Sequence, residues 1–171
     1  MLELRYPNAQ DEAVLRLAHE ELALDGSNFL LDAYQPTDQF SDYLARVQNS
    51  ASGANLMEGR VRADYFVAVV DGVVVGRSSI RHELNDWLAT YGGHIGYAVR
   101  PGFRRQGFAT EILRQSLIYA KGLGLARVLL TCFDENIGSR TVIESQGGIL
   151  QDKVEEDGLL TRRYWIDLSV L

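Results

Sequence analysis

The stretch GHIGYAVRPGFRRQGFATEILRQSLIYAKG, residues 93–122, decides the fold that we expect. It predicts a buried strand over Gly93–Val99, a stop at Pro101, a basic turn that contains Gly107, and then a helix of several turns. Apolar residues recur in this helix with the period of a face that packs on a sheet: Phe108, Ile112, Leu113, Leu117 and Ala120. This order leaves free backbone N–H groups at a helix N-terminus.

The turn before this helix has the composition of a phosphate-binding site. The first turn of a helix carries unpaired N–H donors and the positive end of the peptide dipoles, which together attract phosphate oxygens. Gly107 lets the backbone approach a bulky anion, Ala109 keeps the same face open, and Thr110 offers a hydroxyl. Arg104 and Arg105 add positive charge. The same residues also fit a plain connection with a solvated basic face, so the turn by itself leaves both interpretations open.

Two motifs follow one another in the second half of the chain. The residues R-x-x-G-x-A at 104–109 come directly after the predicted strand, and N-I-G-S at 136–139 is followed by Glu144 and by two glycines at 147–148. The first motif resembles Q/R-x-x-G-x-G/A, the acyl-CoA signature of the GNAT superfamily of N-acetyltransferases. The second is similar to N-x-x-A/S and E-x-x-G of that family. The resemblance covers roughly residues 64–168.

The predicted fold is a mixed α/β single domain of the acyl-CoA N-acyltransferase kind over residues 1–171, with a CoA-binding core at about 93–148. We expect a largely antiparallel sheet with helices on both faces. The strands at 93–99 and 127–133 should be central parallel neighbours, because a helix connects them by a right-handed crossover. In the resembled fold this parallel pair splays apart.

The resemblance implies acetyl-CoA as co-substrate. Its pantetheine arm would lie between the splayed strands and bond to the free edge of the first strand, and its pyrophosphate would lie on the basic turn. Two further residues would lie near the arm on its opposite side. The implied contacts are Tyr97, Ala98 and Val99 on the edge, Arg104, Arg105, Gln106, Gly107, Phe108, Ala109 and Thr110 in the turn, and Asn136 and Ser139 opposite.

The chemistry implied is attack of a neutral amine on an acetyl thioester. An alkylammonium with a pKa of about 10 must first lose a proton, so a base or a water chain is needed. His94 and His82 are the candidate bases, with Glu83 third, because histidine titrates near neutral pH. A histidine that bonds backbone in the sheet or loop is the competing interpretation.

The proton donor for the leaving thiolate stays unassigned. Many members of the resembled family have a tyrosine seven residues after the asparagine of the second motif, and this chain has Ile143 there. Tyr97 and Tyr119 are present, but their spacing does not place either hydroxyl at the sulfur.

The flanking segments predict the rest of the domain. Residues 2–6 predict a strand, a helix capped by Asn8 or Asp11 continues to about Leu24, and Asp-Gly at 71–72 predicts a type I′ hairpin. The other elements that we expect are a helix at 36–48, strands at 65–70, 73–81, 149–155 and 160–168, and a helix at 136–146. In the resembled family the first helix pair borders the acceptor site, so the candidate contacts are Phe29, Tyr34, Phe40 and Tyr43.

Composition limits the partners. With 46% hydrophobic and 23% charged residues the 171-residue chain is an ordinary globular domain, and its net charge of −6 argues against nucleic acid. No apolar run approaches the roughly 18 residues of a membrane span, so we expect a cytoplasmic protein without membrane attachment.

The single cysteine, Cys132, is predicted to be a packed thiol, and no Cys/His spacing predicts a metal. Exposed sheet edges allow a homodimer.

Two functions stay open at this stage. The first is an acetyl-CoA-dependent N-acetyltransferase acting on a primary amine of a small molecule or a peptide. The second is a non-catalytic acyl-CoA-binding or sensing module, which Ile143 motivates. A nucleotide-binding domain is a third interpretation, disfavoured because a hairpin precedes the glycine turn. The stretches R-H-E-L-N at 81–85 and G-G-H-I-G-Y at 92–97 also resemble a subgroup of predicted acetyltransferases whose acceptors are unnamed.

Overall fold

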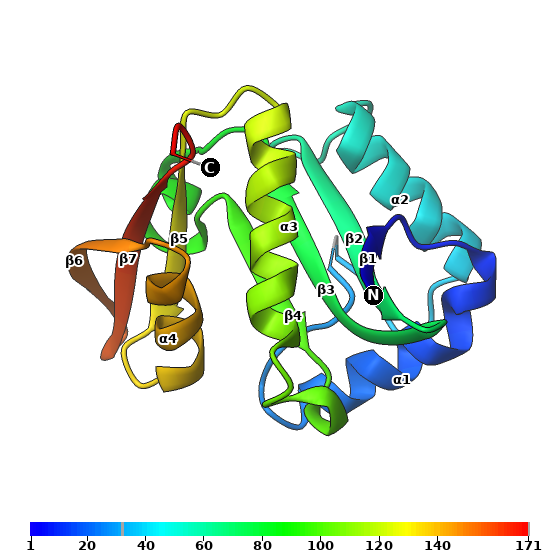
Figure 1. Cartoon of the computed structure of the whole chain (residues 1–171). Coiled ribbons are helices and arrows are strands. Elements are labelled where there is room, and N and C mark those ends of the chain that lie inside the picture. The colour runs from blue at the N-terminus through cyan, green and yellow to red at the C-terminus, as the bar shows by residue number, and fades with distance from the viewer. Residues whose placement is uncertain (32, 171) are drawn as a thin grey trace.

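The computed structural model describes residues 1–31 and 33–170. Figure 1 shows the order of the elements along the chain. The strands are β1 (Leu2–Arg5), β2 (Ala63–Val70), β3 (Val73–Arg81), β4 (Ile95–Val99), β5 (Arg127–Phe133), β6 (Ile149–Glu156) and β7 (Leu159–Asp167). The helices are α1 (Glu12–Ala23), α2 (Phe40–Ser52), α3 (Phe108–Gly122) and α4 (Ile137–Ser145), with helical turns η1 (Ala9–Asp11), η2 (Leu88–Gly92) and η3 (Pro101–Phe103).

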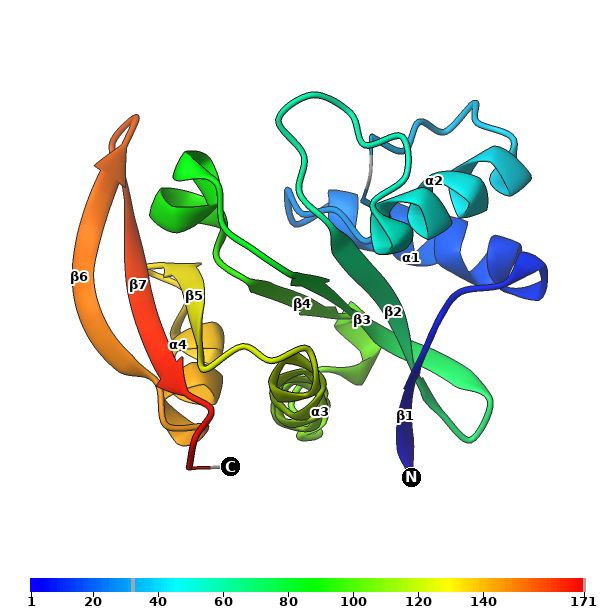
Figure 2. The same ribbon diagram turned by 90° about the horizontal axis from the view of Figure 1, so that it is seen from above.

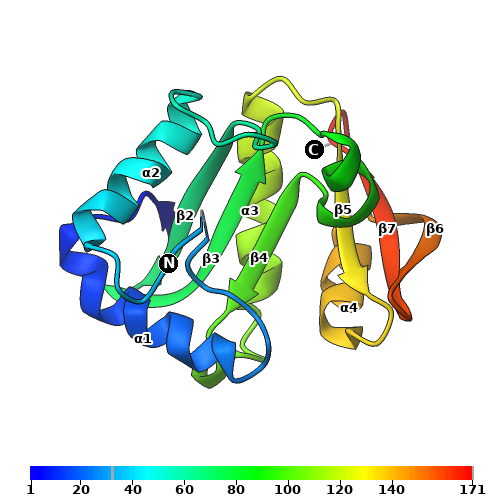
Figure 3. The same ribbon diagram turned by 180° about the vertical axis from the view of Figure 1, so that it is seen from behind.

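The strands form two antiparallel sheets. The first has the order β1–β2–β3–β4 and the second has the order β5–β7–β6. β4 and β5 run in the same direction and move apart toward their C-terminal ends (Figure 3). The predicted mixed α/β domain, with a splayed central pair, is therefore confirmed. One correction is needed: β4 and β5 share no ladder in the described chain, so the expected single sheet is divided in two.

Helices cover both faces of the first sheet. α1 and α2 pack on one face around Tyr43 and Tyr65, and α3 packs on the other face. α4 packs on β5 beside α3, so the α3–α4 layer lies under both sheets (Figure 2). Leu113 of α3 and Tyr164 of β7 are both fully buried in the core that this layer shares with the two sheets.

The hairpin of β2 and β3 follows the turn prediction. Asp71 and Gly72 have φ angles of +50° and +81°, and left-handed backbone at both central residues is what a type I′ turn requires. β2 begins two residues earlier than predicted, at Ala63. A bulge at Ala68/Val69 shifts the register of the pair.

The first two helices differ from the predictions in detail. α1 buries Leu15, Ala18 and Leu22. The predicted cap Asn8 caps the preceding turn η1 and not α1, and Asp11, which precedes α1, makes no side-chain cap bond. α2 begins four residues later than predicted and ends at Ser52, four residues beyond the predicted end. None of the described helices is long and apolar enough to cross a membrane.

Candidate active site

β4 presents a free edge to the gap between the sheets. At the end of its ladder with β3, Arg100 N–H donates to Val75 O (2.9 Å). Bonded and non-bonded pairs alternate in an antiparallel ladder, so Ala98, two residues earlier, also directs its backbone groups toward β3. The backbone groups of Tyr97 and Val99 therefore point into the gap. Ala98 does not belong to this open edge, contrary to the prediction.

The turn between β4 and α3 leaves the helix N-terminus without a cap. Gly107 precedes the helix at φ +81°, and no side chain bonds the N–H groups that follow it. Arg105 is also left-handed (φ +61°), and successive N–H groups in such a backbone form an anion-binding concavity. Phe108, Ala109 and Thr110 are half-buried, and no atom lies within 4 Å of where a Cβ at Gly107 would stand. The turn therefore has room for a bulky anion.

Polar side chains surround this turn. Arg104 forms an exposed ion pair with Asp25 (2.7 Å) and also donates to Val99 O (3.3 Å). Gln106 donates to a backbone carbonyl of the turn (3.4 Å). The exposed Arg105 guanidinium has no hydrogen-bond or ion-pair partner among residues 1–31 and 33–170. The Arg105 guanidinium is therefore available to bind an anion. The Arg104 guanidinium must first release the Asp25 carboxylate before it can bind one.

A partly buried ion pair fixes the start of the turn to α1. Arg100 donates to both carboxylate oxygens of Glu21 (2.8 Å each) and to Val74 O (2.9 Å). This hydrogen bonding holds the pKa of the Glu21 carboxyl below its ordinary value of 4.5. Because the folded protein binds this proton less readily than the unfolded chain does, the pair stabilises the fold above pH 4.5. That stabilisation is lost as the pH falls through the lower folded pKa.

We therefore expect Glu21→Gln to lower the free energy of unfolding by roughly 1–2 kcal/mol at pH 7. The difference from the wild type should shrink toward zero as the pH is lowered below about 4. Urea unfolding at several pH values measures it. Glu20→Gln is the matched control, because Glu20 is its exposed neighbour on α1. An unchanged difference at low pH would contradict the assignment.

A pocket of about 680 Å³ lies on the α1–α2 side of the first sheet. Its floor is β3 at Ser79 and Arg81, and a Cβ at Gly96 of β4 would lie only 3.3 Å from Arg81 Nη1. On this side the pocket is lined by β3, whose Arg81 stands next to Gly96 of β4. The walls are formed by His19, Asn28, Leu30, Leu31, Ala33, Tyr34, Gln35, Ser50, Gly59, Arg60, Val61, Ala63, Asn85, Trp87 and Leu88.

The linker between α1 and α2 is tied to β4 beneath this pocket. Arg77 donates to Asn28 O (2.9 Å) and to Gly96 O (3.3 Å), and burial lowers the pKa of Arg77. Tyr34, one of the four aromatic residues expected to contact an acceptor, lines the pocket. The other three belong to the core, because each is at most 5% exposed: Phe29, Phe40 and Tyr43.

The chain that carries the open edge, the uncapped turn and the pocket matches a known protein family. A family model described as an acetyltransferase (GNAT) domain matches residues 1–149. The chain belongs to the GNAT acetyltransferase family. The resemblance of the 104–109 motif to this family is thus confirmed at the level of the family. No curated protein matches the sequence.

Solved GNAT structures share the fold. Mycobacterium smegmatis RimJ in complex with CoA-disulfide has a TM-score of 0.73 at 22% identity, over 99% of this chain and 83% of that one. The yncA protein of Salmonella typhimurium with acetyl-CoA has a TM-score of 0.66 at 15% identity, over 98% and 94%. A chimera of spermidine N-acetyltransferase SpeG from Vibrio cholerae and hSSAT has a TM-score of 0.67 at 20% identity, over 99% and 96%. At these identities the likeness establishes the fold.

Acetyl-CoA is the co-substrate of the GNAT family, and the described residues fit it. The uncapped N-terminus of α3 and the unpartnered Arg105 suit a pyrophosphate. The N–H groups of Tyr97 and Val99 and the C=O of Tyr97 suit the amides of a pantetheine arm, whereas Val99 O already accepts from Arg104. Contact with the other predicted residues of the GNAT turn stays a prediction.

The N-terminus of α4 lies opposite the open edge. Asn136 caps the helix by accepting from Ser139 N–H (3.0 Å), so its side-chain oxygen is already occupied. Tyr97 extends its side chain across to this helix and donates to Ser139 O (3.4 Å). Both predicted residues of the second GNAT motif therefore lie where α4 faces β4. Their contact with acetyl-CoA stays a prediction.

The three candidate bases lie apart from the pocket. His94 is 6% exposed, and its Nδ1 accepts from Leu129 N–H (2.9 Å). Burial, with the positive charge of Arg81, lowers the pKa of His94 to about 4. His82 bonds a carboxylate on the α3 side of the sheet, and Glu83 is exposed. None of these three described residues lines the pocket, and a catalytic role for them stays a prediction.

Sequence reasoning missed the carboxylate that His82 contacts. Asp64 is 2% exposed and shares hydrogen bonds with His82 Nε2 (2.7 Å), Tyr6 OH (2.5 Å) and Tyr119 OH (3.0 Å). The four side chains come from β2, the loop after β3, the chain after β1, and α3. Their hydrogen bonds explain how a carboxylate can be buried there. The GNAT motifs give no signal for this cluster.

Ile143, which stands where many members of the family have a tyrosine, faces the core. Ile143 is 1% exposed and packs on Tyr164, and a Cβ at Gly148 would lie 2.5 Å from its Cγ2. Burial raises the pKa of Cys132 to about 11, so the thiol stays neutral, as its packed environment predicted. Among residues 1–31 and 33–170, no group of three or more His, Cys, Asp or Glu could hold a metal ion.

Proposed function

We propose that this GNAT protein transfers the acetyl group of acetyl-CoA to a primary amine of a small molecule or a peptide, by direct attack of the amine on the thioester. We also propose that residues 1–171 act as one acetyltransferase domain, with its CoA-binding core at about 93–148. One arrangement supports the proposal. The uncapped turn at Gly107, the open edge of β4 and the pocket beside Gly96 follow one another along β4.

The residues of the open edge would act on the acyl group. Acetyl-CoA supplies a thioester carbonyl that a neutral amine can attack. Backbone N–H groups at Tyr97 and Val99 point into the gap, so one of them can stabilise negative charge that develops on a carbonyl oxygen. These donors belong to a strand and need no reorganisation.

The amine would lose its proton to water in the pocket. His19 lines the pocket, but its Nδ1 accepts from Leu30 N–H (3.1 Å) and burial lowers its pKa, so the neutral ring carries its proton on Nε2. The predicted bases lie outside the lining. A chain of water molecules through this half-polar pocket is therefore the proton route that we propose.

Tyr97 is our proposed proton donor for the leaving thiol. Burial raises the pKa of Tyr97 to about 12, so its hydroxyl keeps a proton at neutral pH. We expect Tyr97→Phe to lower kcat about tenfold, below the usual effect of a general acid, because a thiolate with a pKa near 8.5 leaves readily. The Kd for CoA should stay within about twofold, since the ring still packs.

Steady-state kinetics and calorimetry test this expectation. Tyr119→Phe is the matched control, because it also removes a hydroxyl on the α3 side of the first sheet, but one that bonds Asp64 and not α4. Equal kcat values for the wild type and Tyr97→Phe would remove Tyr97 from the mechanism.

The proposed function is tested by calorimetric titration with acetyl-CoA, followed by a thiol-release screen against primary amines. Binding with release for at least one amine is the expected result. Binding without release over a broad panel would support the alternative of a sensing module, which the buried Ile143 favours because no acid stands at that position. Absence of binding would contradict both functions.

A further inference from the structure

The two sheets touch at the first residues of β4, and one histidine makes the contact. We propose that His94 is a positioning residue whose imidazole fastens β5 to the start of β4 and so sets the point at which the gap for acetyl-CoA opens. This proposal rests on the proposed function, since it concerns the same gap. It gives His94 a role other than that of a base.

His94 bonds both backbone groups of one residue on β5. Its N–H donates to Leu129 O (2.7 Å), and its ring Nδ1 accepts from Leu129 N–H (2.9 Å). Leu129 is 1% exposed, so neither of these bonds can be replaced by water at low cost. In a parallel ladder Leu129 N–H would bond the carbonyl of Gly92, and the imidazole takes the place of that carbonyl.

The backbone carbonyl of His94 does not continue a parallel ladder with β5, in which it would accept from Thr131 N–H. It accepts from Arg81 N–H (2.7 Å) and therefore faces β3. Gly93 makes the approach possible, because a Cβ there would stand 2.6 Å from Leu129 O. A strand that continued with backbone bonds would extend the parallel ladder along β5. Because the His94 carbonyl faces β3, the pairing with β5 stops there, and the edge at Tyr97 and Val99 is left open.

The environment of the ring keeps it in this role. His94 is almost entirely buried and lies edge-on to Trp165 of β7, with ring centroids 6.2 Å apart. Its low pKa keeps the imidazole neutral at physiological pH, so Nδ1 retains the lone pair that accepts from Leu129. A neutral ring in this tautomer carries its proton on Nε2 and has no ready acceptor for an amine proton.

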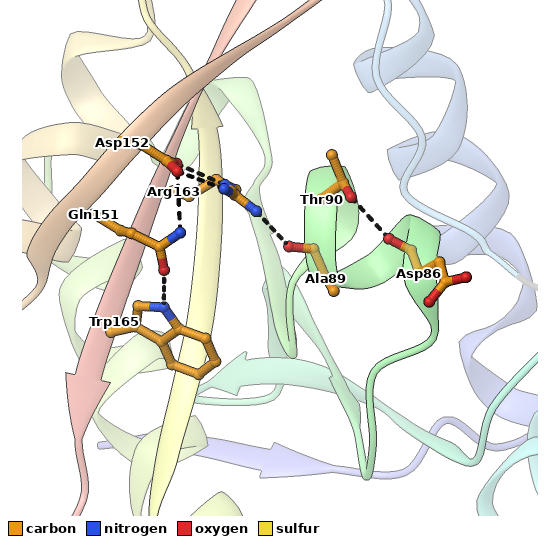
Figure 4. Close-up of polar contacts among 7 residues, drawn as sticks. All are labelled: Asp86, Ala89, Thr90, Gln151, Asp152, Arg163 and Trp165. Atoms are coloured by element: carbon orange, nitrogen blue, oxygen red, sulfur yellow. Dashed lines mark hydrogen bonds and ion pairs between the residues drawn. The ribbon is translucent and has the colours of Figure 1, made fainter.

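Other contacts at this junction hold η2 and not β4. Arg163 of β7 donates to Ala89 O (3.0 Å) and pairs with Asp152, as Figure 4 shows. Thr131 donates to Tyr91 O (2.5 Å). These bonds fasten the loop before β4 to the second sheet. These two bonds do not involve β4. His94, which directly precedes β4, is therefore the residue that fixes where the gap begins.

The test compares His94→Ala with His94→Asn. Asparagine places Oδ1 the same number of bonds from Cα as the ring Nδ1, so it can accept from Leu129 N–H but cannot act as a base. In the protein without CoA, we expect amide exchange at Leu129 to be about tenfold faster in His94→Ala. The Kd for CoA should rise about tenfold, and His94→Asn should restore both values to within about threefold.

Three outcomes would overturn the proposal. If both variants lose kcat alike while Leu129 exchange and CoA affinity are unchanged, His94 is a base. If His94→Ala lowers thermal stability alone and binds CoA as the wild type does, the contact is merely structural. Failure of His94→Asn to restore either value also contradicts the proposal. If His94→Ala does not fold, His94→Gln is used in its place. Its side-chain oxygen lies one bond farther from Cα than the ring Nδ1, so it is misplaced for accepting from Leu129 N–H.

These results separate the proposal from the proposed function. A wild type that does not bind CoA would refute the function. The comparison of Leu129 exchange between the two variants would then decide by itself whether the imidazole holds β5.

Discussion

Gly107→Glu should lower the affinity for CoA at least 100-fold while the protein stays folded. The side chain would stand in front of the uncapped N-terminus of α3, where it would occupy the path of the phosphates and add a negative charge. No atom lies within 4 Å of the Cβ position, so the substitution creates no clash. The cost to the fold should be about 1 kcal/mol, for placing a side chain at a positive φ angle.

Calorimetry with CoA and thermal unfolding check this prediction together. Gly124→Glu is the control, because Gly124 at the other end of α3 also has a positive φ (+88°) and no neighbour within 4 Å of a Cβ. Both variants should lose similar stability, and only Gly107→Glu should lose CoA. An affinity within threefold of the wild type would mean that the turn does not hold the phosphates.

Gly93→Ala should lower the free energy of unfolding by about 3 kcal/mol. Gly93 has a φ angle of +66° and a ψ angle of −177°, a conformation that is nearly restricted to glycine. A Cβ would also stand 2.6 Å from Leu129 O and 3.3 Å from Leu130 Cα, which are backbone atoms of a buried strand. The variant must push β5 away from the start of β4.

Urea unfolding of Gly93→Ala is best compared with that of Gly72→Ala. Gly72 in the β2–β3 turn has a φ angle of +81° but no atom within 4 Å of a Cβ, so its replacement measures the cost of the φ angle alone, about 1 kcal/mol. The excess loss in Gly93→Ala reports the contact with β5. Equal losses in the two variants would show that the strands are not in close contact there.

Local chemistry explains what could be predicted from the sequence. The bounds of β5 were predicted correctly at Arg127–Phe133, because an apolar run with β-branched and aromatic residues lies between polar turns. The hairpin turn at Asp71 and Gly72 was predicted by its own residues. α3 and the uncapped turn before it followed from Pro101, Gly107 and the helical period.

The rest depends on contacts between distant segments. Asp64 joins Tyr6 and Tyr119, which are 58 and 55 residues away in the chain, and no local spacing announces that cluster. The pocket is likewise assembled from several loops and strands. The contact between the two sheets likewise joins His94 to Leu129, 35 residues along the chain. The pattern of apolar residues in a sequence indicates which faces of helices and strands are buried, but it does not indicate where two neighbouring strands separate.

The ion pair of Arg104 with Asp25 has a consequence for the strength of cofactor binding. Both side chains are about half exposed, at 46% and 45%, and a pair in such surroundings contributes at most about 1 kcal/mol. Asp25 thus holds the guanidinium beside the turn before any phosphate arrives, which lowers the entropy lost when a ligand immobilises it. A phosphate that displaces Asp25 forfeits no more than about a fivefold factor in affinity. The Asp25 carboxylate therefore competes only weakly with a phosphate, and it keeps the Arg104 guanidinium beside the turn until the phosphate binds.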